Sequence, residues 1–349
     1  MTRDIDREGL DRLGDEQYFK MISTANLSDN SKKGYINHLK KVKSVVSQSR
    51  KKDVELGWIV RHARRSYDIL AASNPKRKTL KTWVASVLAL LKHSRIKQQQ
   101  RHHFNNWYNL YKPLKKEDEE KDSSNVAEGR SLEGAIRWKE VVEARDRSGR
   151  EEFGSKEHLV LSMFSMMGPR RQGDFHRVRL LLEKPFPKGY KDESAYLDLT
   201  QDPAVVTVTE YKTKKFYENW TKDLPPDLTR VILSGLDKDP NREYLFVQKN
   251  GEPFNTVNAF TQFTNRVFKK WLGPKVTLNS LRHAAAEENI YDRGKRDPEK
   301  DAYANDMGHS AEMHKKYRKV ITDDEYEKVL EERERLKSKK TKKVLVRIS

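Results

Sequence analysis

The chain has 349 residues, a formal net charge of +19 at pH 7 and no cysteine. The absence of cysteine excludes disulfides, thiolate metal ligands and a thiol nucleophile. So basic a composition favours a polyanionic partner such as DNA, because each Lys or Arg that neutralises a phosphate releases a counterion. A ribosomal or otherwise merely basic protein is the alternative.

The length suggests two domains, and residues 1–112 predict a helical, DNA-binding one. Apolar residues recur there at helical spacing in four stretches, and Ser28 and Asn30 are candidate N-caps for the first stretch. The four stripes are Tyr35, Leu39, Val42 and Val46; Trp58, Ile59, Ala63 and Tyr67; Leu80, Trp83, Val84, Val87, Leu88 and Leu91; and Phe104, Trp107, Tyr108 and Tyr111. The basic residues expected to contact DNA are Lys40, Lys41, Arg64, Arg65, Lys76, Arg77 and Lys78. A helical domain with a solvated cationic surface is the alternative.

Residues 113–131 predict a charged linker. The segment starts at Pro113, contains few apolar residues and shows no periodicity. Two domains joined in this way can close around a duplex.

From about Leu132 the pattern changes to mixed helix and strand, so the whole chain is expected to be α+β. Extended stretches at 196–199, 205–209 and 216–220 predict a small antiparallel three-stranded sheet. The last two flank a lysine-rich hairpin tip that contains Lys212, Lys214 and Lys215. Helices are expected at 255–271, 279–291, 311–321 and 323–337. We expect residues 132–325 to form the second domain and 326–349 a C-terminal helix with a basic, strand-like tail.

A set of polar residues runs through the second domain in a characteristic order. It comprises Arg170 and Arg171 before Asp174, Lys212, Asn279 before Arg282 and His283, the Gly308-His309-Ser310 motif, and Tyr317. This ordered set resembles the active site of the tyrosine recombinases, or phage-type integrases. The resemblance covers about residues 132–321 through these motifs. It extends more loosely to 15–112, which look like the helical core-binding domain of those enzymes.

The resemblance implies that the chain cuts and rejoins specific double-stranded DNA sites through a 3′-phosphotyrosyl bond, as a homotetramer, without metal, ATP or another cofactor. The implied catalytic residues are Arg171, Lys212, Asn279, Arg282, His309 and Tyr317. Asp174 and His283 are expected to support these residues from the second layer of the site. Two arginines are suited to stabilising the scissile phosphate, because a guanidinium group stays charged and donates two parallel hydrogen bonds to its oxygens. Lys212 is expected to protonate the leaving 5′ oxygen. Lys214 and Lys215 compete for that role and otherwise contact DNA.

Three points of the assignment stay open. Arg170 competes with Arg171 for the position of the first arginine. Asn279 stands where the family usually has a histidine, and asparagine donates a hydrogen bond but does not shuttle protons. The interval from His309 to Tyr317 is eight residues where nine is common, and one residue turns a helix by about 100°. Divergent members from eukaryotic mobile elements or large DNA viruses differ at such points.

Two other functions fit the same residues. A type IB topoisomerase uses the same covalent chemistry to relax DNA, and a basic DNA-binding protein derived from a recombinase would have lost it. The tail resembles those by which neighbouring recombinase protomers dock, although a frayed cationic tail or a nuclear localisation signal fits as well. Because no secretory signal or long apolar run is seen, we expect an intracellular protein. Cytoplasm, host nucleus and virion are not distinguished.

Overall fold

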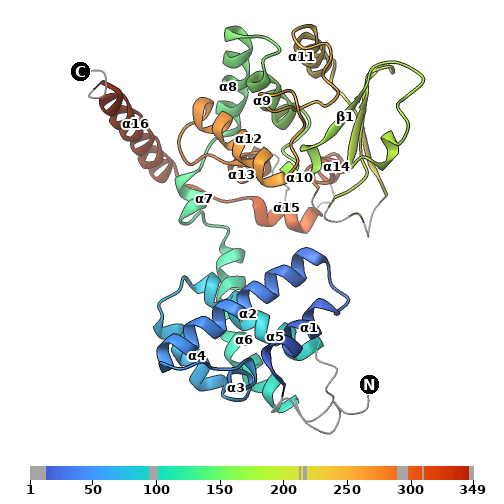
Figure 1. Ribbon diagram of the computed structural model, residues 1–349. Helices are drawn as coiled ribbons and strands as arrows, with labels where there is room; N and C mark the ends of the chain where they lie inside the picture. The colour runs from blue at the N-terminus through green and yellow to red at the C-terminus, as the bar shows by residue number, and fades with distance from the viewer. Residues whose placement is uncertain are drawn as a thin grey trace. The chain divides into compact units, whose positions relative to one another are not determined.

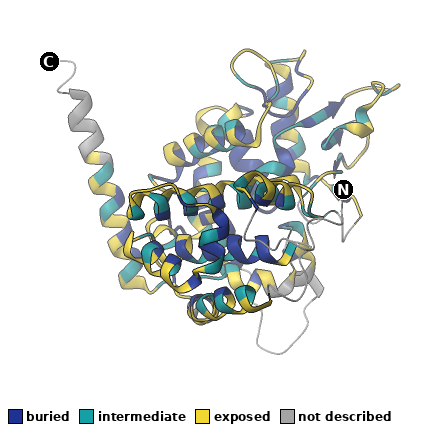
Figure 2. Cartoon of the chain, turned by 60° about the horizontal axis from the view of Figure 1, so that its bottom comes forward, coloured by how far each residue is buried: buried dark blue, intermediate teal, exposed yellow. Residues whose placement is uncertain are grey.

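The computed structural model describes residues 13–93, 101–211, 214, 218–288, 298–308 and 310–345. The chain divides into two compact units, Met1–Ser124 and Asn125–Ser349 (Figure 1). Each unit has its own cluster of buried apolar residues. Figure 2 shows these residues on the inward faces of the helices and on the sheet. The α+β class expected from the sequence is confirmed, because helices dominate and the described residues contain one small sheet.

The first unit is helical throughout its described part. Its helices are α1 (Asp15–Ser23), α2 (Asp29–Arg50), α3 (Leu56–Arg61), α4 (Ala63–Ala72), α5 (Arg77–His93) and α6 (Arg101–Ser124). The predicted stripe of α2 is confirmed, since Leu39, Val42 and Val46 are fully buried. Ser28 is the N-cap that the sequence suggested, and its hydroxyl accepts from the amide of Ser31 at 3.3 Å.

The predicted linker is helical over its first part, which corrects the sequence interpretation. Helix α6 continues through Pro113 to Ser124. Leu114 is buried in the core of the first unit, and Asp118, also buried, accepts a hydrogen bond from Lys81 on α5. The charged residues therefore neutralise cations of a neighbouring helix, an interaction across the fold that sequence periodicity does not reveal.

The second unit surrounds one central helix. Its helices are α7 (Arg130–Glu133), α8 (Trp138–Glu151), α9 (Lys156–Met166), α10 (Gln172–Phe175), α11 (Pro226–Asp237), α12 (Val257–Trp271), α13 (Leu278–Glu288), α14 (Pro298–Asp306), α15 (Ala311–Tyr317) and α16 (Asp323–Leu345), with a 3₁₀ turn at Tyr190–Asp192. Helix α9 packs against α8, α11 and α12. Residues 158–164 on it are all buried, as expected for a helix enclosed on every side.

The sheet has four strands in the order β1 (Val178–Leu181), β2 (Ala195–Asp198), β3 (Val205–Val208) and β4 (Trp220–Asp223). The antiparallel pairs β2–β3 and β3–β4 match the expected meander. The expectation of three strands is wrong, because β1 adds a parallel edge, with Val178 opposite Ala195. The last strand also begins at Trp220, where the predicted stretch ended.

The C-terminal helices differ from the prediction at their ends. Helix α15 ends at Tyr317, four residues earlier than expected, because Arg318 is extended and Val320 forms a backbone bridge with residue 126. Helix α16 continues to Leu345, and its N-terminal half packs on the unit through Tyr326, Val329 and Arg333. The end of the tail, which was predicted to be a strand, is therefore helical up to Leu345. Residues 346–349 lie outside the described residues. In the described part of the chain, no helix is long and apolar enough to cross a membrane.

Candidate active site

The two adjacent arginines of the first motif have different environments. A turn after α9 leads through Gly168, at φ +76°, into Pro169 and the arginines. Arg170 is only 1% exposed. Arg171 is the N-cap residue of α10 and is half-buried, and its Nη1 has no hydrogen-bond partner among the described residues. The sequence left open which of the two faces the site, and the geometry favours Arg171.

Asp174 lies between these arginines and the second motif. Its buried carboxylate accepts from Nε of Arg170 at 3.0 Å. Burial raises the pKa of Asp174, while the positive charges of Arg170, Arg171 and Arg282 oppose that rise. The three guanidinium groups and one carboxylate therefore form a single electrostatic cluster with an excess of positive charge.

Arg282 on α13 is the second guanidinium of the cluster that lacks full pairing. It is 1% exposed, and its Nη1 donates to the carbonyl of Pro169 at 2.6 Å. Its Nε and Nη2 are buried without a hydrogen-bond partner in the described structure. Burial lowers the pKa of Arg282, and the positive charge of Arg171 lowers it further. The charge of an ionised Tyr317 and a side-chain hydrogen bond with that residue raise the pKa. Buried N–H groups without partners are costly, so they indicate a place for an anion.

Tyr317 lies over this guanidinium. The Cζ atom of Arg282 is 4.8 Å from the centroid of the tyrosine ring, within the range of a cation–π contact. His283, the next residue on α13, packs its ring 5.3 Å from the Tyr317 ring, and its Nδ1 is 2.5 Å from the Tyr317 carbonyl oxygen. A protonated Nδ1 therefore donates to that oxygen, which assigns the tautomer.

The segments on both sides of Tyr317 are fixed to the unit. Ser310 caps α15 by accepting from the amide of Met313 at 3.3 Å. After the tyrosine, the amide of Val320 donates to the carbonyl of Asn125 at 2.7 Å, and the amide of Ala127 donates to Val320 at 3.2 Å. Tyr317 is thus the last residue of a short, capped helix. The segment 318–322 that follows it is held by these bonds, and we call this segment the strap.

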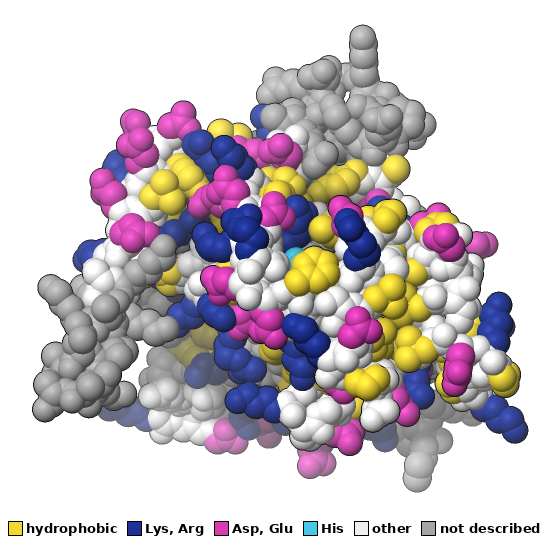
Figure 3. Space-filling view, turned by 90° about the horizontal axis from the view of Figure 1, so that it is seen from above, with side chains coloured by type: hydrophobic (Ala, Val, Ile, Leu, Met, Phe, Trp, Pro, Cys, Tyr) yellow, Lys and Arg dark blue, Asp and Glu magenta, His cyan; other side chains and the backbone are white. Residues whose placement is uncertain are grey.

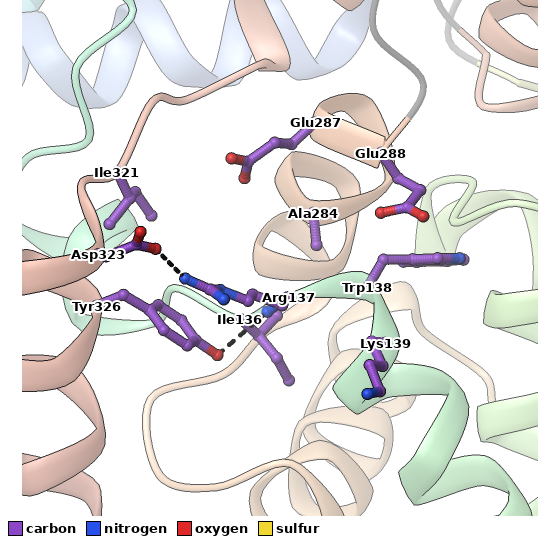
Figure 4. Close-up of a pocket in the computed structure, with 10 residues that line it drawn as sticks. All are labelled: Ile136, Arg137, Trp138, Lys139, Ala284, Glu287, Glu288, Ile321, Asp323 and Tyr326. Atoms are coloured by element: carbon purple, nitrogen blue, oxygen red, sulfur yellow. Dashed lines mark hydrogen bonds and ion pairs between the residues drawn. The ribbon is translucent and has the colours of Figure 1, made fainter.

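The start of α16 anchors the far end of that strap. Arg137 pairs with Asp323, and its backbone amide donates to the hydroxyl of Tyr326 at 3.3 Å (Figure 4). These residues border a cavity of about 330 Å³ between α8, α13 and the strap. Burial raises the pKa of Glu287 at its edge. The cavity lies on the C-terminal half of α13, separate from the guanidinium cluster.

The remaining predicted site residues are not all placed. Asn279 is exposed on the first turn of α13, one turn before Arg282. Lys212, Lys215 and His309 lie outside the described residues. Gly308, at φ +69°, borders the arginines, since a Cβ there would lie 3.5 Å from Nη2 of Arg170 and 3.8 Å from Nη1 of Arg171. Lys214 donates to the side chain of Asn219. Two contacts of the arginines were not predicted from the sequence. They are the carbonyl of Pro169, which accepts from Arg282, and the ring of Trp220, over which Arg170 lies. No sequence pattern indicates either contact.

The basic residues of the first unit that are predicted to contact DNA are all exposed, whereas Lys214 of the hairpin tip is half-buried. Two of them are neutralised within the chain, Arg64 by Asp68 and Arg77 by Glu117. The other exposed cations of the set are Lys40, Lys41, Arg65, Lys76 and Lys78. On the face shown in Figure 3, Lys and Arg are interspersed with Asp and Glu. In the described part of the chain, no group of three or more His, Cys, Asp or Glu is placed to hold a metal ion.

The environment of His283 predicts a pH dependence of stability. Burial lowers the pKa of His283 below its ordinary value of 6.5, and burial has the same effect on His158. The unfolded chain therefore binds more protons below about pH 6.5, so stability falls as the pH falls through that value. We expect the urea midpoint of the second unit to drop between pH 7.5 and pH 5.5. His283→Asn should flatten this drop, and an equal drop in the variant contradicts the assignment.

Comparisons with known proteins give matches among solved structures. No protein-family model matches the chain, and no curated protein matches it. Among solved structures, a XerA recombinase is similar over 91% of this chain and 98% of its own, with 14% sequence identity and a TM-score of 0.36.

Proposed function

We propose that this chain is a tyrosine recombinase that cuts and rejoins DNA through Tyr317. The observation that carries the proposal is that Arg171 and Arg282 have buried N–H groups without partners among the described residues, and that the guanidinium of Arg282 lies by the ring of Tyr317. A phosphodiester supplies the anionic oxygens that such groups bind. A tyrosine within the same cluster supplies the nucleophile.

In the proposed reaction, the phenol of Tyr317 gives up its proton to solvent, its oxygen attacks the scissile phosphorus, and the bond from phosphorus to the 5′ oxygen breaks. The products are a 3′-phosphotyrosyl link and a free 5′-hydroxyl. The negative charge that builds on the non-bridging oxygens is stabilised by Arg171 and Arg282. Lys212 is the proposed donor of the proton to the 5′ oxygen, and His309 and Asn279 are proposed to hydrogen-bond the phosphate.

Rejoining reverses this chemistry. The 5′-hydroxyl of a partner strand attacks the phosphotyrosyl bond and releases the phenol. The bond energy is kept in the covalent link, so the proposal includes neither metal nor ATP. The proposed partners are double-stranded DNA and further copies of the chain, in a tetramer on two sites.

The test is a trap for the covalent intermediate. Duplexes that bind the chain are selected from a random-sequence pool, and nicks are placed a few nucleotides 3′ of each tested phosphate. The short 5′-hydroxyl fragment then diffuses away, so the covalent protein–DNA adduct accumulates. An adduct with strand-joining products supports the recombinase, and an adduct with relaxation alone supports a type IB topoisomerase. Tight binding without adduct at any tested phosphate contradicts both and favours a non-catalytic DNA-binding protein.

DNA affinity should depend steeply on salt, in proportion to the phosphates contacted. We expect Lys76→Ala combined with Lys78→Ala to reduce the slope of log affinity against log salt by about two. Arg77→Ala is the matched control, because Glu117 already pairs with this guanidinium, and it should change the slope by less. Slopes measured by fluorescence anisotropy between low and high salt decide the point. Equal slopes in the double variant and the parent contradict the assignment of this segment to DNA.

A further inference from the structure

Arg170 makes contacts that Arg171 does not. Its Nε pairs with Asp174 at 3.0 Å. Its Nη1 donates to the carbonyl oxygens of Asn305 at 3.3 Å and of Asp306 at 3.1 Å, at the end of α14. Its Cζ lies 4.2 Å from the centroid of Trp220 on β4. A single buried guanidinium therefore touches α10, α14 and the sheet.

These contacts join the segments that carry the other proposed site residues. Asn305 and Asp306 lie three and two residues before Gly308, where an added Cβ would come within 4 Å of both arginines. Asp306 also pairs with Lys222 on β4. The guanidinium lies 5.5 Å from the ring of Tyr211, the residue before the lysine-rich tip. The network thus spans the turn that presents Arg171, the end of α14 and the base of the hairpin.

We propose that Arg170 is a positioning residue, whose buried guanidinium fixes the turn and the end of α14 so that Arg171 faces the scissile phosphate. The inference rests on the proposed function. We do not expect Arg170 itself to bind the phosphate, because its Nε and Nη1 already donate to Asp174, Asn305 and Asp306. Its pairing with Asp174 also offsets the cost of burying both charges.

The competing explanation is an ordinary core ion pair, and lysine distinguishes the two. A lysine keeps the charge and can pair with Asp174. It has no planar fork to donate to Asn305 and Asp306 at the same time, and no flat face to stack on Trp220. Arg170→Lys therefore preserves charge balance in the core while releasing the segments from one another.

The experiment measures single-turnover adduct formation on the trapping duplex at saturating DNA. We expect Arg170→Lys to slow the rate about 10- to 100-fold, because a small misplacement of a catalytic group costs this much. Its DNA affinity should stay within about twofold of the parent, since phosphate contacts set affinity. Arg242→Lys is the matched control, because Arg242 is a buried arginine of the same unit that packs beside Gly235 on α11. It should leave the rate unchanged.

A double-variant cycle separates positioning from general loss of structure. If Arg170 acts through Arg171, then Arg170→Lys adds little to the loss already caused by Arg171→Ala. Multiplying losses, or a rate equal to the parent's, overturn the inference. So does a weakened DNA affinity that accounts for the whole loss.

Folding is controlled by a second variant. Trp220→Leu removes the face under the guanidinium without leaving a buried charge unpaired, and it should show the same non-additivity with Arg171→Ala. Additive losses in this pair contradict the inference even if Arg170→Lys does not fold. Failure of the proposed function is distinct, because then the parent chain itself forms no adduct.

Discussion

Tyr317→Phe is expected to abolish the covalent protein–DNA adduct. The substitution removes the phenolic oxygen that forms the bond to phosphorus, and loss of a nucleophile lowers such rates by at least about 10³-fold. It keeps the ring that lies over Arg282 and beside His283. We therefore expect DNA affinity and the urea midpoint to stay close to those of the parent. Adduct yield on the trapping duplex, read on a denaturing gel, gives the measurement.

Tyr303→Phe is the matched control for this result. Tyr303 lies on α14 and packs its ring edge-on to His314 of α15, so it is a tyrosine of the same neighbourhood that the proposed reaction does not use. It should form adduct at the parental rate. An undiminished adduct with Tyr317→Phe shows that another residue is the nucleophile, and peptide mapping of the adduct identifies it.

The helices of the fold were predictable where only one face of the helix is buried. The stripe of Leu39, Val42 and Val46 gave α2 correctly because each side chain enters the same core. The extension of α6 beyond Pro113 was not predictable, since it depends on Lys81 meeting Asp118 across the fold. Strand β1 is a short edge of four residues with little alternation, so it has no distinct pattern in the sequence.

The site was predictable in part, for a related reason. The order of the motifs led to Arg171, Arg282 and Tyr317, and the structure brings Arg282 and Tyr317 into contact. The motif favoured Arg171 over Arg170 without excluding Arg170, because the direction of the turn after Gly168 decides which of the two is buried. Residues that act through a backbone carbonyl, as Pro169 does for Arg282, leave no mark on the side-chain pattern.

Arg282→Ala is expected to slow adduct formation by about 10²- to 10³-fold, the usual cost of removing one donor to a developing oxyanion. Two of its three nitrogens are buried and lack partners among the described residues, so the variant leaves space where the phosphate oxygens are proposed to bind. Arg282→Lys should recover little of the rate, because an ammonium cannot replace the fork that also donates to Pro169. Single-turnover rates at saturating DNA give the comparison.

A change in the substrate tests the reason for that loss. A methylphosphonate at the scissile position replaces one charged non-bridging oxygen by a methyl group, so less negative charge develops in the transition state. If Arg282 stabilises that charge, the loss caused by Arg282→Ala shrinks on this substrate. If Arg282 only holds α13 against Pro169, the loss is the same on both substrates, because the protein defect does not depend on the phosphate. The ratio of the two losses therefore separates charge stabilisation from structural support at a residue that is fully buried in the absence of DNA.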